Sequence, residues 1–323
     1  MTSLSPGADI PSDTHTLIDS RLRKLSYSSR LLLHSCPRKY QLYRLNAETT
    51  TPEEEAEVSQ SVTFAFGTVV GVGIQELLQG ATLDAAILAM FLEWEPDLLA
   101  YNTKQKKSFF TAVFAVQHFD DIRGRGYLDD YELVTTPEGK PAVELSFQVS
   151  IHDSQGTFYY RGYVDAVLRH TLTNEILVLE LKTTSGQINS ATYKNSSQAI
   201  GYSVVLDKLF PDLSSYQVLY LVYSTKSMGY EPLIFEKSLL QRALWLQELL
   251  VEIEKIKLYE TYGYPMHGES CFSWYRECEY LGLCTLSTER LVNGTHVPRE
   301  EPEYIYNLTF DELVESQIAK GGV

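Results

Sequence analysis

The sequence predicts an α/β protein in which strands in the middle of the chain are flanked by helices. Runs rich in Val, Ile, Leu and Tyr, bounded by turn residues, predict strands near 131–134, 141–151, 157–169 and 175–183. Apolar residues at helical spacing before and after this block predict helices on both sides of it. With 323 residues, 44% of them hydrophobic, the chain can bury a large core.

The first part of the chain predicts a helical lobe over residues 21–125. It follows a segment, residues 1–20, whose Ser, Thr, Pro and Asp content predicts a disordered tail. A helix is expected from near Ser28 to about Leu45, since serines at its start can cap it. Residues 67–123 predict three further helices.

Residues 126–285 predict the α/β core, and residues 286–323 predict a polar, acidic C-terminal tail with a short helix after Thr309. The last part of the core ends in a segment that carries three of the four cysteines. After the four strands above, we expect a helix near 191–208, strands at Tyr216–Tyr223 and Glu231–Glu236, and an amphipathic helix at Lys237–Tyr259.

The net charge of −15 argues against a broad basic surface for duplex DNA. A nucleic-acid-binding protein of this composition must confine its positive charge to a groove, although short basic runs usually form solvated faces. No apolar run reaches the roughly 18–20 residues that span a bilayer, so we expect a cytoplasmic protein in a reducing compartment, without membrane contact. The basic candidates are Arg21, Arg23, Lys24, Arg38, Lys39, Arg44, Lys104, Lys106 and Lys107.

Two of the predicted strands carry Asp165, Glu180 and Lys182, and the polar turn between them predicts a hairpin. A turn centred between Leu172 and Thr173 places Asp165 directly opposite Glu180. Lys182 then lies on the same face, because strand side chains alternate with period two.

Two carboxylates held this close repel each other unless a cation lies between them, and hard oxygen ligands suit Mg²⁺ or Mn²⁺. A lysine beside the metal can orient a water molecule, which is the arrangement needed for phosphodiester hydrolysis. The simpler interpretation is a surface Glu–Lys pair at the end of a buried strand.

These strands resemble those of the PD-(D/E)XK nuclease superfamily, in the branch of the RecB and AddB nuclease domains and the CRISPR-adaptation nucleases. The residues that carry the resemblance are Gly162–Asp165, as G-x-x-D, and Glu180–Lys182, as E-x-K. Gln198 and Tyr202 match the Q-x-x-x-Y motif of the following helix and share one helical face, where they could contact DNA.

The resemblance implies a restriction-endonuclease-like mixed sheet flanked by helices, and a Mg²⁺- or Mn²⁺-dependent deoxyribonuclease. It implies an exonuclease that acts on single-stranded or duplex DNA ends in recombination, repair or viral DNA metabolism, with a possible helicase or recombination partner. Asp165 and Glu180 would bind the metal, and Lys182, Gln198 and Tyr202 would complete the catalytic set. The alternatives are a non-catalytic DNA-end-binding or assembly protein on the same scaffold, an RNase and a site-specific endonuclease.

The four cysteines, Cys36, Cys271, Cys278 and Cys284, resemble the four-cysteine [4Fe-4S] site of the same branch. The last gap fits the family spacing, but six residues separate Cys271 from Cys278 where the family has two. A structural Cys₄ zinc site and four ordinary buried cysteines are the alternatives.

One motif residue of the family is absent, because Gly71 stands where the pattern F-G-T-x-x-H has its metal-binding histidine. Gln75, Glu76 and Glu144 are the side chains that could approach the metal in its place. For Gln75 and Glu76, a solvated helix face is the simpler role.

Overall fold

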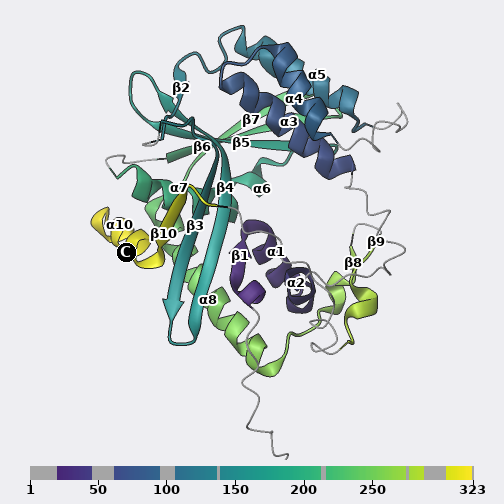
Figure 1. Ribbon diagram of the computed structural model, residues 1–323, viewed down its shortest axis with the longest axis vertical. Coiled ribbons are helices and arrows are strands. Elements are labelled where there is room, and N and C mark those ends of the chain that lie inside the picture. Colours follow the sequence, from purple (N-terminus) through teal and green to yellow (C-terminus); the bar gives the residue numbers. More distant parts are fainter. Residues whose placement is uncertain are drawn as a thin grey trace, which may run out of the picture.

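The computed structural model contains a central sheet with helices packed on both of its faces (Figure 1). No described helix combines the length and the apolar character that a membrane span requires. The disordered tail predicted over 1–20 falls almost entirely outside the described residues. The structure describes residues 20–45, 62–94, 106–136, 139–211, 216–273, 276–286 and 303–321.

The central sheet is mixed, with eight strands, and its main path runs in the order β10-β3-β4-β5-β6-β7. The pairs β10–β3, β5–β6 and β1–β4 are parallel, whereas β3–β4, β4–β5, β6–β7 and β2–β4 are antiparallel. The strands are β1 (Lys24–Ser26), β2 (Tyr131–Leu133), β3 (Val143–Asp153), β4 (Gly156–His170), β5 (Ile176–Thr184), β6 (Tyr216–Ser224), β7 (Gly229–Glu236) and β10 (Tyr306–Thr309).

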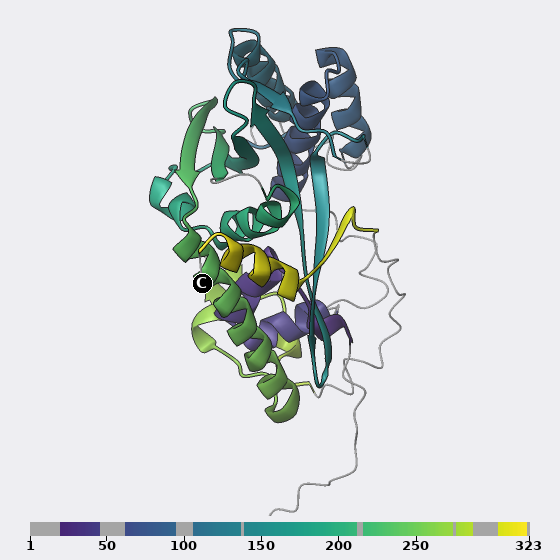
Figure 2. The same ribbon diagram turned by 90° about the vertical axis from the view of Figure 1, so that its left-hand side faces the viewer.

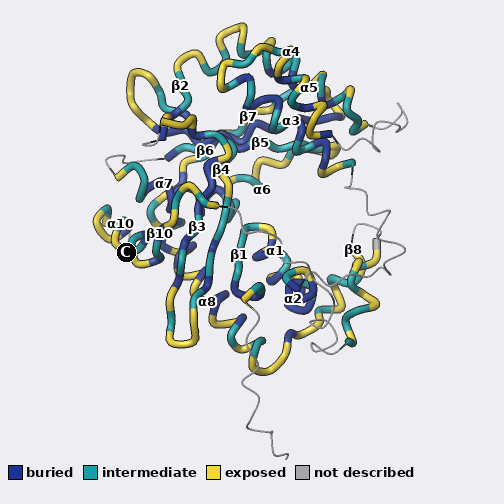
Figure 3. The backbone as a smooth tube through the Cα atoms, viewed as in Figure 1, coloured by how far each residue is buried: buried dark blue, intermediate teal, exposed yellow. Residues whose placement is uncertain are grey.

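The hairpin of β4 and β5 has the register that the sequence predicts. Ala166 pairs with Leu179 and Val167 with Val178, which centres the turn between Leu172 and Thr173. The apolar first half of β5 and nearly all of β6 are buried (Figure 3), since both of their faces are covered by helices.

Three helices cover one face of the sheet: α3 (Val62–Leu78), α4 (Leu83–Glu93) and α5 (Phe109–Arg123). Side-chain caps fix the starts of the last two, because Thr82 and Ser108 accept hydrogen bonds from backbone N–H groups one turn later. Their apolar faces form one core with side chains of β4, β5 and β6. The three helices predicted over 67–123 are therefore confirmed.

The opposite face carries α1 (Tyr27–Ser35), α2 (Pro37–Arg44), α7 (Ser197–Leu209) and α8 (Leu239–Tyr262), with the short α6 (Ser190–Lys194) before α7 (Figure 2). The helical lobe expected over 21–125 is thus divided between the two faces, and β1 belongs to the sheet. The single helix expected from Ser28 to Leu45 is also broken, at Cys36, whose extended backbone is the conformation favoured before a proline.

The expectation of a polar tail over 286–323 is corrected by the structure. β10 pairs in parallel with β3, and the helix predicted after Thr309 is α10 (Phe310–Ala319). The buried carboxylate of Asp207 in α7 holds this helix, because Gln317 and Lys320 each donate a hydrogen bond to it at 2.5 Å. The composition of the segment predicted a tail because most of its residues are polar, and only the side that faces the core is apolar.

The cysteine segment follows α8 and lies on the side of α1 and α2 (Figure 1). It contains two short 3-10 turns, η4 (Gly268–Ser270) and η5 (Leu281–Leu283), and a small hairpin of β8 (Phe272–Ser273) and β9 (Arg276–Glu277). A further 3-10 turn, η1 (Ser20–Arg23), precedes β1.

Candidate active site

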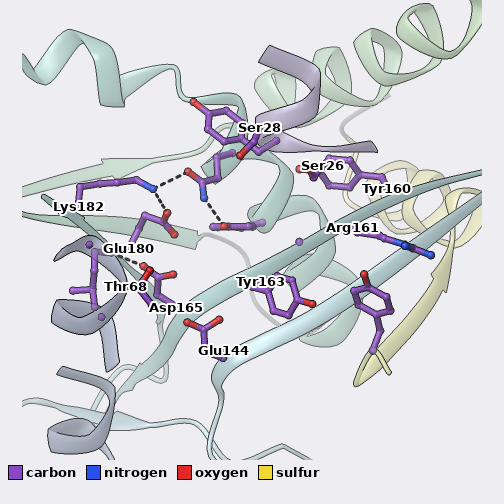
Figure 4. A pocket seen from close by; sticks show the side chains of 18 of the residues that line it. Ser26, Ser28, Thr68, Glu144, Tyr160, Arg161, Tyr163, Asp165, Glu180 and Lys182 are labelled. Carbon is purple, nitrogen blue, oxygen red and sulfur yellow. Dashed lines mark hydrogen bonds and ion pairs between the residues drawn. The ribbon is translucent and has the colours of Figure 1, made fainter. Parts of the chain in front are cut away.

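The candidate site lies where β4 changes its neighbour on one edge. Arg161 pairs with Ser26 of β1, and Ala166, further along the same strand, pairs with Leu179 of β5. Since β3 occupies the other edge of β4, both partners share one edge, and the described ladders leave the stretch between them without a partner there. A pocket of about 570 Å³ opens at this point (Figure 4).

Asp165 stands at the point of divergence. The β4–β5 ladder ends at the pair of Ala166 and Leu179. Beyond it, the Asp165 Oδ2 accepts a hydrogen bond of 2.7 Å from the backbone N–H of Leu181. The side chain thereby replaces the backbone partner that Leu181 loses where the strands part. This contact fixes the carboxylate close to Glu180, but the directly opposed Asp165–Glu180 pair expected from the sequence is not part of the ladder, which ends at Ala166 and Leu179.

A chain of hydrogen bonds links the remaining predicted catalytic residues. Lys182 Nζ lies 2.5 Å from Glu180 Oε1 and 3.1 Å from Gln198 Oε1. The amide of Gln198 in turn donates to the hydroxyl of Tyr202 at 2.7 Å. The five predicted catalytic residues therefore lie together, although Tyr202 is only 3% exposed and contacts the others chiefly through Gln198.

Glu180 is the most deeply buried of these charged groups, at 1% exposure. Its Oε2 is buried and has no hydrogen-bond partner. Burying a carboxylate oxygen without a partner is costly, so this oxygen is suited to a cation in the pocket.

The electrostatics of the site follow from burial and crowding. Burial, and then the charge of the other carboxylate, raise the pKa of Asp165 well above its ordinary value. Burial also raises the pKa of Glu180, against the opposing effect of Lys182. Burial lowers the pKa of Lys182, but the facing charges of Glu180 and Asp165 outweigh it and raise that pKa overall.

Glu144 adds a third carboxylate to this row. Its neighbours Val143 and Leu145 pair with β4 on either side of Asp165, so Glu144 lies opposite Asp165 on the edge away from β5. Its backbone has a φ of 47°, which is uncommon for a residue with a side chain. The amide of Gln75 in α3 donates to its Oε1 at 2.6 Å.

The glycine in place of the family histidine also lines the pocket. A Cβ at Gly71 would meet no atom within 4 Å, so a side chain would fit there. Gln75, one turn later, faces the pocket and holds Glu144, whereas Glu76 is not among the residues that line it. Of the candidates to replace the histidine, Gln75 and Glu144 are brought to the site.

The other end of the pocket is basic and aromatic. Its lining includes Lys24, Arg44, Arg161, Tyr163 and Tyr304, and we call these five residues the basic end of the pocket. We call Glu144, Asp165, Glu180 and Lys182 the carboxylate end. Arg161, Tyr163 and Tyr304 carried no recognisable sequence signal, because they stand in ordinary strand and loop contexts.

Several of the basic residues expected to line a groove serve the fold instead. Arg23 is buried against Glu260, and Arg38 donates to the backbone oxygens of Cys284 and Leu286. Lys107 lines a second pocket of about 490 Å³, which has Lys182 in common with the first. Lys104 lies outside the described residues.

The four cysteines come from opposite ends of the chain into one neighbourhood. Burial raises the pKa of the Cys284 thiol, and nearby Cys278, Cys36 and Cys271 raise it further. The backbone oxygen of Ser35 accepts one hydrogen bond from the Ser270 hydroxyl and lies 3.1 Å from His267 Nδ1, which joins the cysteine segment to the break between α1 and α2.

The thiols do not form a tight group. Across the described ranges, only His34, Glu248 and Glu252 bring three ligand atoms within 4.8 Å of one another. Both of these glutamates are ion-paired with Arg30, whose guanidinium supplies the positive charge at that place.

Comparison with known proteins places this geometry in a family. The model of the PD-(D/E)XK nuclease superfamily matches residues 24–285. No curated protein matches the chain.

Two solved structures are similar to the chain at low identity. A protein of Eubacterium rectale, described as a candidate exonuclease, is 10% identical, with a TM-score of 0.47 over 92% of this chain and 97% of that one. A protein designated SSO0001 is 11% identical, with a TM-score of 0.27 over 64% and 80% of the two chains. At these scores neither likeness supports a conclusion. The family match covers most of the chain, and the protein therefore belongs to the PD-(D/E)XK nuclease superfamily, with the mixed sheet and flanking helices of its restriction-endonuclease-like fold.

Proposed function

We propose that this protein is a metal-dependent deoxyribonuclease whose active centre is the carboxylate end of the pocket. The observation that carries the proposal is the buried Oε2 of Glu180, which has no hydrogen-bond partner and stands beside Asp165 in a polar pocket. The donor set fits a hard divalent cation, because carboxylate oxygens are the ligands that Mg²⁺ and Mn²⁺ prefer. Asp165 and Glu180 would hold the metal.

A divalent cation bound there supplies Lewis-acid polarisation of a phosphate and lowers the pKa of a coordinated water. The chain's own groups do the rest. Lys182 is the one cation of the carboxylate end, and its ammonium can orient the attacking water and stabilise the negative charge that develops on the phosphate. Its hydrogen bonds to Glu180 and Gln198 hold it in place.

Gln198 and Tyr202 have different roles in this proposal. Gln198 is partly exposed in the pocket and can contact a DNA phosphate, while Tyr202 is buried and orients the Gln198 amide by accepting its hydrogen bond. Tyr202 is therefore a positioning residue.

We further propose that the enzyme acts from DNA ends, in recombination, repair or viral DNA metabolism, as in the RecB and AddB branch that its motifs resemble. The G-x-x-D, E-x-K and Q-x-x-x-Y residues meet at one site, which supports this assignment. A helicase or recombination partner would be consistent with the acidic surface, because a net charge of −15 weakens unassisted binding to duplex DNA.

The test is cleavage in Mn²⁺ of end-labelled linear and covalently closed circular DNA, each single-stranded and duplex. We expect linear DNA to be degraded and circles of the same sequence to survive much longer. Equal loss of linear and circular DNA would identify an endonuclease. Binding to ends without any cleavage, in Mn²⁺ or Mg²⁺, would identify the alternative, a non-catalytic end-binding protein.

We also propose that Cys36, Cys271, Cys278 and Cys284 hold a structural [4Fe-4S] cluster. The proposal rests on the resemblance of these four cysteines to the cluster-binding set of the family, and on the fold, which joins the cysteine segment to the break between α1 and α2 at Cys36. Such a centre would close a loop of more than two hundred residues and so stabilise the fold.

Protein purified without oxygen should absorb broadly in the visible region and contain about four irons per chain. Cys→Ser at any of the four positions should lower the iron content and the melting temperature together. Colourless protein with one zinc and no iron would replace the cluster by a structural zinc site.

A further inference from the structure

The basic end of the pocket contains an ordered aromatic platform, formed by Tyr163, Tyr304 and Arg161. The rings of Tyr163 and Tyr304 have centroids 6.2 Å apart, and the Arg161 guanidinium lies 5.1 Å from the centre of the Tyr304 ring. Tyr163 remains 42% exposed, so its ring can accept a further partner. Figure 4 shows Tyr163 and Arg161 on the pocket floor that also carries Asp165.

Two hydrogen bonds with side chains of β3 hold this platform in place. Arg161 Nε donates to Gln148 Oε1 at 2.7 Å, which fixes the guanidinium on the sheet. The N–H of Ile305 donates to Ser146 Oγ at 3.0 Å, which fixes the segment that carries Tyr304. Rigid aromatic side chains lose little entropy when a ligand stacks on them, so the platform is prepared for binding.

The same end of the pocket favours an anion. Burial lowers the pKa of Arg44, and the positive charge of the nearby Arg161 also acts to lower it. Within the described ranges, Arg44 forms no ion pair with a carboxylate, and its Nε donates to the backbone oxygen of Arg21. The N-terminus of α1, at Ser26–Ser28, faces this region with its partial positive charge.

The platform is in register with the carboxylate end. Arg161, Tyr163 and Asp165 alternate along β4, so their side chains share one face at steps of about 7 Å. A nucleotide strand that lies along β4, with one phosphate at Asp165, therefore brings its neighbouring base over Tyr163 and its neighbouring phosphates toward Arg161 and Arg44.

We propose that the basic end of the pocket binds a single DNA strand next to the cleaved phosphate, by stacking an unpaired base on Tyr163 and Tyr304. Aromatic side chains bind single strands in this way because every base has a π-face, whereas the bases inside a duplex are already stacked on one another. The proposal rests on the proposed nuclease function and specifies its substrate as an unpaired strand or end. It also gives the C-terminal segment a role, because that segment supplies Tyr304.

The test measures affinity rather than activity, in the full chain made inactive by Lys182→Ala. Fluorescence anisotropy gives Kd for a labelled oligothymidine and for a blunt duplex. Adding Tyr163→Ala or Tyr304→Ala should weaken oligothymidine binding about 10-fold or more, and leave duplex binding nearly unchanged. Tyr→Phe at either position should retain most of the affinity, since the ring remains.

Tyr262→Ala is the matched control, because Tyr262 is 82% exposed at the end of α8 and does not line the pocket. Circular dichroism melts verify that each variant folds. Unaltered oligothymidine affinity in folded Tyr163→Ala and Tyr304→Ala proteins would overturn the proposal, as would an equal loss for single strands and duplex. Failure of the nuclease function itself has a separate signature, which is wild-type cleavage by Lys182→Ala.

Discussion

The two ends of one pocket are built by opposite physical means. At the carboxylate end, Glu180 is almost wholly buried and one of its oxygens lacks a partner. At the basic end, Tyr163 is substantially exposed, and Arg161 rests on an aromatic ring and an amide. The first end holds unfavourable electrostatic energy that a bound cation would relieve, while the second has its charges partnered by rings and amides and leaves Tyr163 exposed.

The difference fits the separate tasks that we propose for the two ends. Chemistry needs buried, strongly coupled charges whose energy depends on what is bound. Strand binding needs stacking surfaces and positive charge that are available before the substrate arrives. Each end takes side chains from β4, where the strand leaves β1 and joins β5: Asp165 at the carboxylate end, and Arg161 and Tyr163 at the basic end. One feature of the topology therefore underlies both proposed tasks. From this division we expect substitutions at the two ends to have effects that differ in kind as well as in size.

The largest effect is expected at the carboxylate end. Lys182→Met keeps the aliphatic stem and removes the charge beside Glu180, so kcat should fall about 10²- to 10⁴-fold with little change in DNA affinity. Single-turnover cleavage in Mn²⁺ and anisotropy measure the two quantities separately. A large loss of affinity with kcat intact would contradict the division between the ends.

A smaller loss is expected when the support of Glu144 is removed. Gln75→Ala deletes the amide that donates to the Glu144 Oε1, and residues of this supporting kind typically contribute 10- to 100-fold to metal affinity or activity. The loss should appear as a higher Mn²⁺ concentration for half-maximal cleavage. Gln75→Glu, which places a like charge against Glu144, should be worse than alanine. If both variants need no more Mn²⁺ than wild type, Glu144 lies outside the metal site.

At the basic end the expected effect is on salt dependence. Arg44→Gln and Arg161→Gln each remove one candidate phosphate contact, so the slope of log Kd for oligothymidine against log salt should decrease by about 0.7 per substitution. Tyr163→Phe should leave that slope unchanged, because stacking releases no counterions. If neither arginine substitution alters the slope, Arg44 and Arg161 do not contact DNA phosphates.

The smallest effect, on stability, has a defined pH dependence. Because the folded state raises the pKa values of Asp165 and Glu180, their contribution to stability without metal is fully present below the ordinary carboxyl pKa and is lost as pH rises through the raised values. Asp165→Asn, whose Oδ can still accept from Leu181, escapes that loss.

In EDTA, the melting temperature of Asp165→Asn minus that of wild type should therefore increase by a few degrees as the pH is raised from mildly acidic values to pH 8. Added Mn²⁺ should stabilise wild type more at the higher pH and leave the variant nearly unaffected. A difference between the two proteins that stays constant with pH would show that Asp165 is ionised without cost in the folded chain.

The sequence by itself determined the parts of the site that depend on local geometry. The alternation of a strand put Glu180 and Lys182 on one face, the turn centre fixed the register of β4 and β5, and one helical turn joined Gln198 to Tyr202. These relations span few residues, so periodicity alone predicts them.

Only the tertiary structure decided which distant segments complete the pocket. Arg44 is the last residue of α2, which begins after the break at Cys36. Glu144 depends on the β3–β4 register and on Gln75 of α3, and Tyr304 is brought to the pocket by the pairing of β10 with β3. Pairing between strands far apart in the chain is set by the shape and burial of the whole core, and a single sequence carries no local signal of it. For the same reason the C-terminal segment read as a polar tail, although its buried side is part of the protein's core.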